Sequence, residues 1–567
     1  MRTPRCLVLA IFAVAPVAQA TPQLPSTTTI SVVGTSDLHG HIAALPWFAG
    51  YLENLRAKRA ATGGAVVVLD AGDMFQGTLE SNLEEGAPVV RAYNTLGYSA
   101  VAIGNHEFDF GPAGPAPSPV GPHDDPQGAL KARAAQARFP FLAANVIDKA
   151  TGRPVAWPNF HPSTLITVAG IKVGIVGVVT AATPHSALPA NVAGLDFLPL
   201  AKTIAREARL LRARGASVVL AVAHEGGECH DFADPDKLDS CDVASTIFSI
   251  VRSLPRGSVD AVVAGHTHQA LAQRVASVPI IQSYSNGRAF GRVDLIVERP
   301  GDDKGERPRA WRAKVVASHL YQPHDLCPDS TPADCKPTDY EDRAVHADKK
   351  VDELNARAFA QARRKGEEDL GVQVVRPLPH SRKRETALGN LLVDLMRAAR
   401  PGIDVAMLNG GGMRAGLPAG PLSYGRLYET FPFDNAFASL RMSAGEFRKL
   451  LARSLSRSPS QVSLSGLRLS ARCKGDTLEV ALIRPDGAPI EDDQMLTILT
   501  TDFLATGGDG FFDGANVDYN IGSPLRDGLA EALLKRGGTL DPEDRLLFDP
   551  AHPRFSLPSD VPVKCSR

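Results

Sequence analysis

The sequence lacks an excess of charge of either sign. Its 567 residues contain 61 Lys and Arg against 62 Asp and Glu, for a formal net charge of −1. Nucleic-acid polymers and anionic membranes attract proteins with a basic surface, and this composition provides no such electrostatic footprint. Any positive field for a small anion must therefore be local. The hydrophobic content of 44% is ordinary for a globular protein.

Long apolar segments are absent after the N-terminus, so we expect no membrane span. The N-terminus itself has the form of an export signal. Arg2 and Arg5 precede an apolar run, residues 7–17, which is too short to cross a bilayer and is followed by the small-residue site Ala18-Gln19-Ala20. We predict that residues 1–20 are a signal peptide and that the mature chain is exported, to the periplasm or the medium. A short membrane anchor is the alternative.

Cysteine is scarce, and one of the seven cysteines lies within the predicted signal. An even number in an exported protein favours disulfides. Cys229–Cys241 and Cys327–Cys335 would close short loops, which leaves Cys473–Cys565 to hold the C-terminus. Free thiols are the alternative.

Five short hydrophobic runs each end in a small-residue turn that carries Asp, Asn or His. They are residues 29–34, 65–69, 101–103, 218–222 and 261–263. Each is rich in Val, Ile and Ala and short, which favours a buried strand over a helix. Because side chains at the ends of several strands can converge in a folded core, we predict that these turns build one site.

The polar residues of these turns are typical of a two-metal hydrolytic centre. They are Asp37, His39, Asp73, Asn105, His224, His266 and His268. A mixed oxygen and nitrogen set suits Zn, Mn, Co or Fe, and the absence of Cys argues against a structural zinc site. Two metals about 3.5–4 Å apart can activate a bridging hydroxide for in-line attack on a phosphoryl group. A lone Asp after a strand is more often a turn or cap residue, and a lone His is more often a hydrogen-bonded core or surface residue. The pattern as a whole predicts the metal centre.

The motifs that contain these residues resemble those of a known family. Asp37-Leu38-His39-Gly40-His41, Gly72-Asp73, Gly104-Asn105-His106-Glu107-Phe108-Asp109 and Gly265-His266-Thr267-His268 are similar to the calcineurin-like metallophosphoesterase motifs in their 5'-nucleotidase form. The resemblance implies that Asp37, His39 and His268 hold one metal, that Asn105, His224 and His266 hold the other, and that Asp73 bridges them. It also implies that His106 acts on the substrate phosphate and that Asp109 orients His106. A simple turn residue is the alternative for Asp109.

The chain is long enough for two large domains or more. Residues 26–326 alternate strands with helical stretches at 46–60 and 200–214, which predicts an α/β domain. The resemblance refines this domain to a four-layer β-sandwich with flanking helices. Residues 340–367 are charged and helix-favouring, and we expect them to form a linker helix or a helix packed on one domain. Residues 370–567 would form a smaller, mixed α/β domain.

One segment departs from the family pattern. Residues 111–126 are dense in Pro and Gly and cannot form a helix or a central strand. We expect a loop at the rim of the active site that decorates the surface, with a role in substrate choice left open. Its His123, Asp124 and Asp125 are expected to be solvated.

The C-terminal region carries a different set of motifs. Asn409-Gly410-Gly411-Gly412-Met413-Arg414 is a glycine turn that ends in a cation, and Phe431-Pro432-Phe433-Asp434-Asn435 and residues 502–511 are turns with aromatic side chains. A glycine run alone is often only a tight turn. Together, two aromatic turns and a cation favour a nucleotide site, because stacking on a base contributes about 1–3 kcal/mol and Arg can bind phosphate with two hydrogen bonds.

These segments resemble the 5'-nucleotidase C-terminal domain. The resemblance implies that Phe433 and Phe503 stack on the nucleobase and that Asp509 binds the ribose. It also implies that Arg382, Asn409 and Arg414 contact the phosphate or the ribose. Arg384 is an alternative to Arg382, and core packing is the alternative for each Phe.

The sequence therefore predicts an exported metal-dependent 5'-nucleotidase of nucleotide catabolism, which converts nucleoside 5'-monophosphates to nucleoside and phosphate. The substrate would lie between the two domains. Rival substrates on the same fold are nucleotide sugars, nucleoside di- or triphosphates and 2',3'-cyclic nucleotides. A related thiosulfohydrolase and a non-catalytic secreted nucleotide-binding protein are more distant rivals. The metal, the base preference and the oligomeric state stay open, with a monomer as the default.

Overall fold

The computed structural model describes residues 27–114, 116, 118–119, 121, 123–298, 313–327, 336–512 and 519–565. The predicted signal, residues 1–20, and Cys335 lie outside these ranges. Within them, no helix is both long and apolar enough to span a bilayer.

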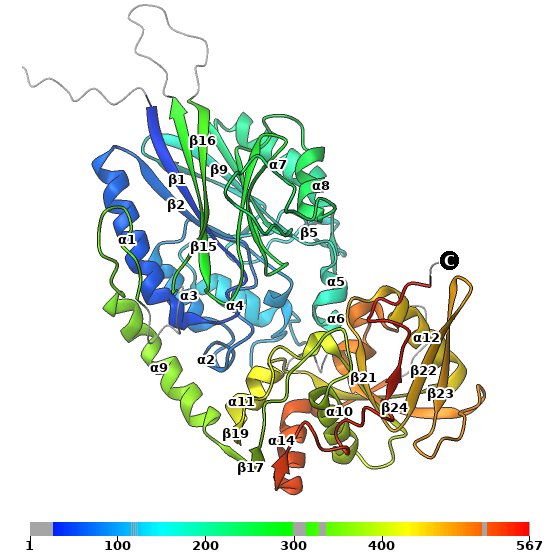
Figure 1. Cartoon of the computed structure of the whole chain (residues 1–567). Coiled ribbons are helices and arrows are strands. Elements are labelled where there is room, and N and C mark those ends of the chain that lie inside the picture. The colour runs from blue at the N-terminus through cyan, green and yellow to red at the C-terminus, as the bar shows by residue number, and fades with distance from the viewer. Residues whose placement is uncertain are drawn as a thin grey trace, which may run out of the picture.

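Two β-sheets packed face to face form the N-terminal part of the chain (Figure 1). The first has the strand order β16-β15-β1-β2-β3-β4-β7 and the second β13-β14-β12-β11-β9-β8. The strands of the first are β1 (Thr27–Thr35), β2 (Ala65–Asp70), β3 (Ala100–Ala102), β4 (Phe141–Leu142), β7 (Phe160–His161), β15 (Ala289–Glu298) and β16 (Lys314–Asp325). Those of the second are β8 (Ser163–Val168), β9 (Ile171–Val179), β11 (Val218–His224), β12 (Ala261–Ala264), β13 (Ala270–Val275) and β14 (Val278–Ser283). A small sheet contains β5 (Val146–Asp148), β6 (Arg153–Pro154) and β10 (Leu195–Phe197).

Alternating side chains on each strand build the layers. In β11, Leu220 packs into the core between the two sheets, whereas its neighbours Val219 and Ala221 pack against the helices outside. This is the two-residue period of a strand buried on both faces. Ile30 and Val33 of β1 divide in the same way on the other sheet. The result is the predicted four-layer arrangement of helix, sheet, sheet and helix.

The helices cover the outer faces of the sandwich. On the first sheet lie α1 (Leu45–Ala61), α3 (Ala87–Leu96) and α4 (Gly128–Gln136), and on the second lie α7 (Leu200–Ala213) and α8 (Thr246–Ser253). Short helices α2 (Leu79–Asn82), α5 (Thr183–Ser186) and α6 (Pro189–Val192) occur in the connections. In Figure 1, α5 and α6 point from the sandwich toward the C-terminal part.

All five predicted runs are strands, namely β1, β2, β3, β11 and β12. β1 pairs with β2, β2 with β3, and β11 with β12, in each case in parallel. Parallel neighbours bring their carboxyl ends to the same edge of a sheet. The turns that follow these strands therefore meet at one end of the sandwich.

Helix α9 (Lys349–Gly366) connects the two parts along one side of the molecule (Figure 1). It contacts α1 and α3 of the sandwich and α11 (Tyr424–Thr430) of the C-terminal part. Asp348 caps its first turn by accepting a hydrogen bond from the main-chain N–H of Val351. Asn355 anchors it to the sandwich, because its Nδ2 donates to the carbonyl of Ile42 at 3.0 Å.

The C-terminal part is built on a mixed five-stranded sheet in the order β21-β18-β24-β20-β25. Its strands are β18 (Val405–Asn409), β20 (Ala436–Ser443), β21 (Val462–Ser465), β24 (Met495–Thr501) and β25 (Tyr519–Pro524). In β18, Ala406 and Leu408 pack toward α10 (Ala387–Ala399) and α14 (Leu525–Arg536), whereas Val405 and Met407 pack toward α12 (Ala444–Arg457). The smaller elements are β17 (Asp369–Val374), β19 (Gly420–Ser423), β22 (Arg468–Lys474), β23 (Thr477–Ile483), β26 (Thr539–Leu540), β27 (Phe555–Ser556) and α13 (Asp502–Ala505). The molecule is thus a mixed α/β protein, as predicted.

Two of the three predicted disulfides lie within the described residues, and both are confirmed. Cys229 bonds to Cys241, and Cys473 bonds to Cys565 near the C-terminus. Cys327 is also disulfide-bonded.

Candidate active site

Six of the seven predicted metal ligands form two overlapping clusters. Asp37, His39, Asp73 and His268 form one, and Asp73, His224 and His266 form the other; within each cluster the ligand atoms lie within 4.8 Å of one another. Asp73 belongs to both clusters, which is the arrangement that a bridging carboxylate requires. The seventh residue, Asn105, joins the second cluster, since its Oδ1 lies 3.1 Å from His224 Nε2.

The chemistry of these donors fits divalent cations. His39 Nδ1 donates to the carbonyl of Gln76 at 2.8 Å, and His224 Nδ1 donates to the carbonyl of Ala71 at 2.8 Å. Each imidazole therefore directs its Nε2 lone pair into the cluster. There, His39 Nε2 lies 3.0 Å from His268 Nε2, and His224 Nε2 lies 3.1 Å from Asp73 Oδ2. Electron-pair donors at such distances repel one another unless a cation or a proton lies between them.

The backbone of the cluster is strained. Five of the seven residues have left-handed φ angles: Asp37 at 52°, His39 at 47°, Asp73 at 56°, His266 at 77° and His268 at 58°. Residues with side chains rarely adopt this region, and those that do gather at functional sites. Main-chain hydrogen bonds hold the turns together, from Asp37 N to the carbonyl of Gly72 and from His39 N to that of Asp73, each at 2.9 Å.

Glycine permits the close approach of two of these turns. A Cβ atom on Gly104 would lie 2.1 Å from Asp73 Oδ1, and one on Gly72 would lie 2.4 Å from Gly104 N. Any side chain at either position would push the turn after β2 away from the turn after β3.

Glu107 is a site residue to which the sequence analysis gave no role. Its carboxylate accepts hydrogen bonds from three main-chain N–H groups: those of Asp73 at 2.8 Å, Met74 at 2.7 Å and Gly104 at 2.6 Å. It thereby fixes the turn that carries Asp73 against the turn that carries Asn105. Burial, together with the charge of Asp73, raises the pKa of Glu107 to about 8. Its place in the Gly104–Asp109 motif was the only available signal.

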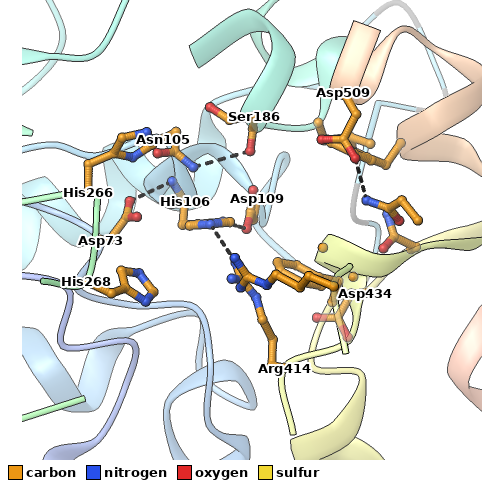
Figure 2. A pocket seen from close by; sticks show the side chains of 18 of the residues that line it. Asp73, Asn105, His106, Asp109, Ser186, His266, His268, Arg414, Asp434 and Asp509 are labelled. Atoms are coloured by element: carbon orange, nitrogen blue, oxygen red, sulfur yellow. Dashed lines mark hydrogen bonds and ion pairs between the residues drawn. The ribbon is translucent and has the colours of Figure 1, made fainter. Parts of the chain in front are cut away.

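His106 lies at the centre of the site, between the metal cluster and the C-terminal part (Figure 2). Its Nδ1 donates to Asp109 Oδ2 at 2.6 Å, and its Nε2 accepts from Arg414 Nη2 at 3.2 Å. Its main-chain N–H donates to Asp73 Oδ1 at 2.9 Å. Burial alone would lower the pKa of His106, but the carboxylates of Asp109 and Asp73 outweigh it and raise the pKa. Asp109 is thus the hydrogen-bond partner of His106 Nδ1.

A cavity of about 520 Å³ joins the two parts of the chain and contains twelve of the fifteen predicted site residues. These are Asp73, Asn105, His106, Asp109, His266, His268, Arg382, Asn409, Arg414, Phe433, Phe503 and Asp509. The other three, Asp37, His39 and His224, are buried in the metal clusters. The described residues of the loop 111–126 do not line this cavity.

The side of the cavity formed by the C-terminal part carries the aromatic and ribose candidates. Phe503 lies over Gly508, where a Cβ atom would come within 2.6 Å of the ring. Asp509 has a left-handed φ of 54° and accepts a hydrogen bond from Asn409 Nδ2 at 2.7 Å. Gly507 and Gly510 thus allow the positive φ angles of this turn, and Gly508 leaves space for the Phe503 ring. Phe431, by contrast, is fully buried in the core.

Two arginines of the C-terminal part, Arg382 and Arg414, line the same cavity. Burial and the neighbouring Arg382 lower the pKa of Arg414 to about 10. Arg384, the alternative to Arg382, instead pairs with Asp560 on the surface at 2.9 Å. Two adjacent guanidinium groups form the local positive field that an anionic substrate requires.

The segment around α5 supplies wall residues that the sequence analysis missed. Ser186 and Leu188 line the cavity, and the carbonyl of Ser186 accepts a hydrogen bond from Asn105 Nδ2 at 3.2 Å (Figure 2). This contact turns Asn105 Oδ1 toward His224. No sequence signal identifies Ser186, because it acts through its main chain.

Comparisons with known proteins agree with both halves of this site. Residues 30–270 match the calcineurin-like phosphoesterase family, and residues 367–543 match the 5'-nucleotidase C-terminal domain. The chain is 25% identical over 524 residues to Protein UshA of Yersinia enterocolitica, covering 86% of each. It is also 25% identical over 542 residues to the 5'-nucleotidase of Vibrio cholerae, again covering 86% of each. A solved 5'-nucleotidase precursor from Thermus thermophilus has a similar fold, with a TM-score of 0.67 and 22% identity over 91% of this chain and all of that one.

Proposed function

The chain belongs to the 5'-nucleotidase family of metallophosphoesterases and is a metal-dependent phosphoester hydrolase; on that premise we propose that it is a dinuclear 5'-nucleotidase that hydrolyses nucleoside 5'-monophosphates to nucleoside and phosphate. One observation carries the proposal. Candidate metal ligands and candidate nucleoside-binding residues face each other across a single cavity of about 520 Å³. That volume is within the usual range for a site that encloses a small ligand.

The two parts of the chain would have different roles, because the candidate metal ligands lie in the N-terminal part and the candidate nucleoside-binding residues in the C-terminal part. Residues 26–326 would hold the metals and carry out the chemistry on phosphorus, residues 370–567 would recognise the nucleoside, and residues 340–367 would link them. Asp37, His39 and His268 would hold one cation and Asn105, His224 and His266 the other, with Asp73 shared. When bound, the two cations supply Lewis acidity toward the phosphoryl oxygens and acidify the attacking water.

His106 is proposed to act on the phosphoryl group or the leaving oxygen. Because Nδ1 is engaged by Asp109, only Nε2 can face the substrate. That atom accepts a hydrogen bond from Arg414 in the absence of substrate. A substrate phosphate would draw the Arg414 guanidinium to itself, because charge-assisted bonds to phosphate are stronger than a bond to a neutral imidazole. Nε2 would then be free to carry a proton, which the nearby carboxylates favour.

The nucleoside would occupy the opposite wall. Phe433 and Phe503 would stack on the base, Asp509 would bind ribose hydroxyls, and Arg382, Asn409 and Arg414 would contact phosphate or ribose. Stacking would contribute about 1–3 kcal/mol. Asn409 is already bonded to Asp509, so the two would act as one ribose-binding pair.

Export to the periplasm or the medium is part of the proposal. The N-terminal signal pattern supports it, as do the disulfides Cys229–Cys241 and Cys473–Cys565, since such bonds persist in oxidising compartments. We propose a monomer whose partner is a small nucleotide.

A second candidate substrate class is favoured by a neighbouring cavity of about 670 Å³. It is lined by His39, His268, Arg382 and Arg414 on one side and by residues of α9 and α11 on the other. A group attached to the far side of the reacting phosphate would find room there. Nucleotide sugars and nucleoside polyphosphates carry such a group, whereas a monophosphate does not.

Phosphate release by the purified mature protein tests the proposal. The substrates are AMP, UDP-glucose, 2',3'-cyclic AMP and p-nitrophenyl phosphate, each assayed after EDTA treatment and after addition of Mn, Zn, Co or Mg. We expect metal-restored activity that is greatest with AMP. Greater activity with UDP-glucose or the cyclic nucleotide would support the metal-dependent mechanism but assign the protein to a different substrate class. Inactivity on all four with metals bound would contradict the proposal and favour a thiosulfohydrolase or a nucleotide-binding protein.

A further inference from the structure

Arg526 is a buried cation outside the cavity, at the second residue of α14, and only 6% of its surface is exposed. Three hydrogen bonds of its guanidinium go to the turn between α11 and β20, residues 431–435. Nε donates to the carbonyl of Phe431 at 3.1 Å, Nη2 to that of Phe433 at 2.6 Å, and Nη1 to Asp434 Oδ1 at 2.7 Å. The group also lies 4.0 Å from the ring centroid of Tyr428. One side chain therefore holds three points of a five-residue turn.

The same turn presents Phe433 to the cavity. The Phe433 ring is 5.6 Å from the His106 ring and 5.1 Å from the Arg414 guanidinium, measured to ring centroids. It is only partly buried, whereas its neighbour Phe431 is fully buried. Phe433 packs against the edge of the C-terminal core, and its ring lies 6.2 Å from that of Phe431. Fixing the backbone of the turn adds to this packing, because an unrestrained side chain loses affinity when a ligand orders it.

The carbonyl of Pro432, which lies between the two carbonyls that Arg526 binds, is directed toward the N-terminal part of the chain. Pro432 O accepts a hydrogen bond from Gln76 Nε2 at 3.0 Å, and the carbonyl of Gln76 in turn accepts the bond from His39 Nδ1 at 2.8 Å. The aromatic turn is thus connected through Gln76 to a metal-ligand candidate. That connection depends on the conformation that Arg526 imposes on residues 431–433.

We propose that Arg526 is a positioning residue for nucleobase recognition: it fixes the turn 431–435 so that Phe433 faces the substrate and the Pro432 carbonyl faces Gln76. The inference rests on the proposed function, because it assumes that Phe433 stacks on a base. Lysine cannot replace this arginine, since a single ammonium group cannot span two carbonyls and a carboxylate with the planar geometry of guanidinium.

Arg526→Lys tests the inference, with Arg554→Lys as the matched control. Arg554 also pairs with a carboxylate, Asp394, and a main-chain carbonyl, that of Leu464, but it does not line the cavity. KM and kcat are measured for AMP and for glycerol phosphate, which has no ring to stack. We expect Arg526→Lys to raise KM for AMP about tenfold, the size of one lost base stack, with at most a twofold change for glycerol phosphate. Arg554→Lys should leave the ratio of the two substrates unchanged.

A double-mutant cycle separates positioning from a general structural role. In a Phe433→Ala background, Arg526→Lys should no longer change KM for AMP, because the ring through which it acts is gone. The same tenfold rise in that background, or equal losses on both substrates, would overturn the inference. If Arg526→Lys does not fold, Asp434→Asn provides a second test, because it alters one of the three hydrogen-bond acceptors of Arg526 at an exposed position. It should also raise KM for AMP. A folded Asp434→Asn protein with unchanged KM for AMP would overturn the inference. Wild-type protein that neither hydrolyses AMP nor binds adenosine in calorimetry would instead refute the proposed function itself.

Discussion

Asp502 offers a quantitative test of how burial changes the pKa of a carboxyl group beside Phe503. It is the first residue of α13, next to Phe503, and only 1% of its surface is exposed. Its Oδ1 accepts hydrogen bonds from Asn435 Nδ2 at 3.0 Å and from the main-chain N–H of Phe503 at 2.8 Å. Burial outweighs these bonds and raises the pKa of Asp502 from 3.8 to about 6. We predict that Asp502→Asn becomes progressively more stable than the wild type as the pH rises.

The sign and size follow from proton linkage. A carboxyl group with a raised folded-state pKa favours the folded state at low pH, and this contribution is lost as the pH rises through the folded-state value, here about 6. A rise in the pKa from 3.8 to about 6 corresponds to about 3 kcal/mol, since one pKa unit is about 1.36 kcal/mol. About 2 kcal/mol of this is lost between pH ~4.5 and pH ~8. Asparagine does not ionise, so the difference between variant and wild type isolates the effect from all other titrating groups.

Scanning calorimetry at the two pH values measures the difference. For a unit of about 200 residues, roughly 2 kcal/mol changes the melting temperature by about 4–8 °C. We therefore expect the variant to gain that much relative to the wild type on going from pH ~4.5 to pH ~8. Asp486→Asn, on an exposed turn of the same domain, is the control for the loss of one carboxylate from the surface. A melting-temperature difference that is the same at both pH values would refute the reasoning.

Three further predictions concern the catalytic machinery. Asp73→Asn should lower turnover by several orders of magnitude and loosen both metals, because Asp73 belongs to both clusters; near-normal activity and metal content by elemental analysis would contradict the shared role. His106→Ala should keep its metal content but lower kcat by about 10²–10⁴-fold, the usual contribution of a general acid or base; loss of metal would make His106 a ligand. Phe433→Ala combined with Phe503→Ala should raise KM for AMP far more than for small aryl phosphates, and equal losses on both would show that the rings serve only packing.

The sequence was sufficient to predict the five strands that precede the candidate site and the polar residues that follow them. Runs of Val, Ile and Ala have few alternatives to a buried strand, and parallel neighbours must bring their carboxyl ends together. Asp37, Asp73 and His268 could therefore be assigned to one centre although they come from distant turns. The resemblance to a family added the pairing of ligands with metals and the division between chemistry and nucleoside recognition.

What the sequence could not indicate are side chains that act on the main chain of a distant segment. Glu107 holds two turns through three N–H groups, Ser186 orients Asn105 through its carbonyl, and Arg526 holds two carbonyls of the aromatic turn. Almost every residue offers a main-chain N–H and a carbonyl group. The sequence therefore does not indicate which segment a side chain such as that of Glu107 or Arg526 will bind. These contacts become visible only when the fold places the segments together.

The five candidate ligands with left-handed φ angles reduce the stability of the folded protein, although the proposed catalytic site requires them. Each such residue costs roughly 1–2 kcal/mol relative to a glycine, which adopts the same φ freely. Replacing His266 by Gly would therefore relieve strain in the metal-free protein while removing a candidate ligand. At such a position, selection for folding stability alone does not conserve the residue with a side chain. Only selection for turnover keeps it, and natural copies of this fold that have lost activity should be found first with substitutions at these turns.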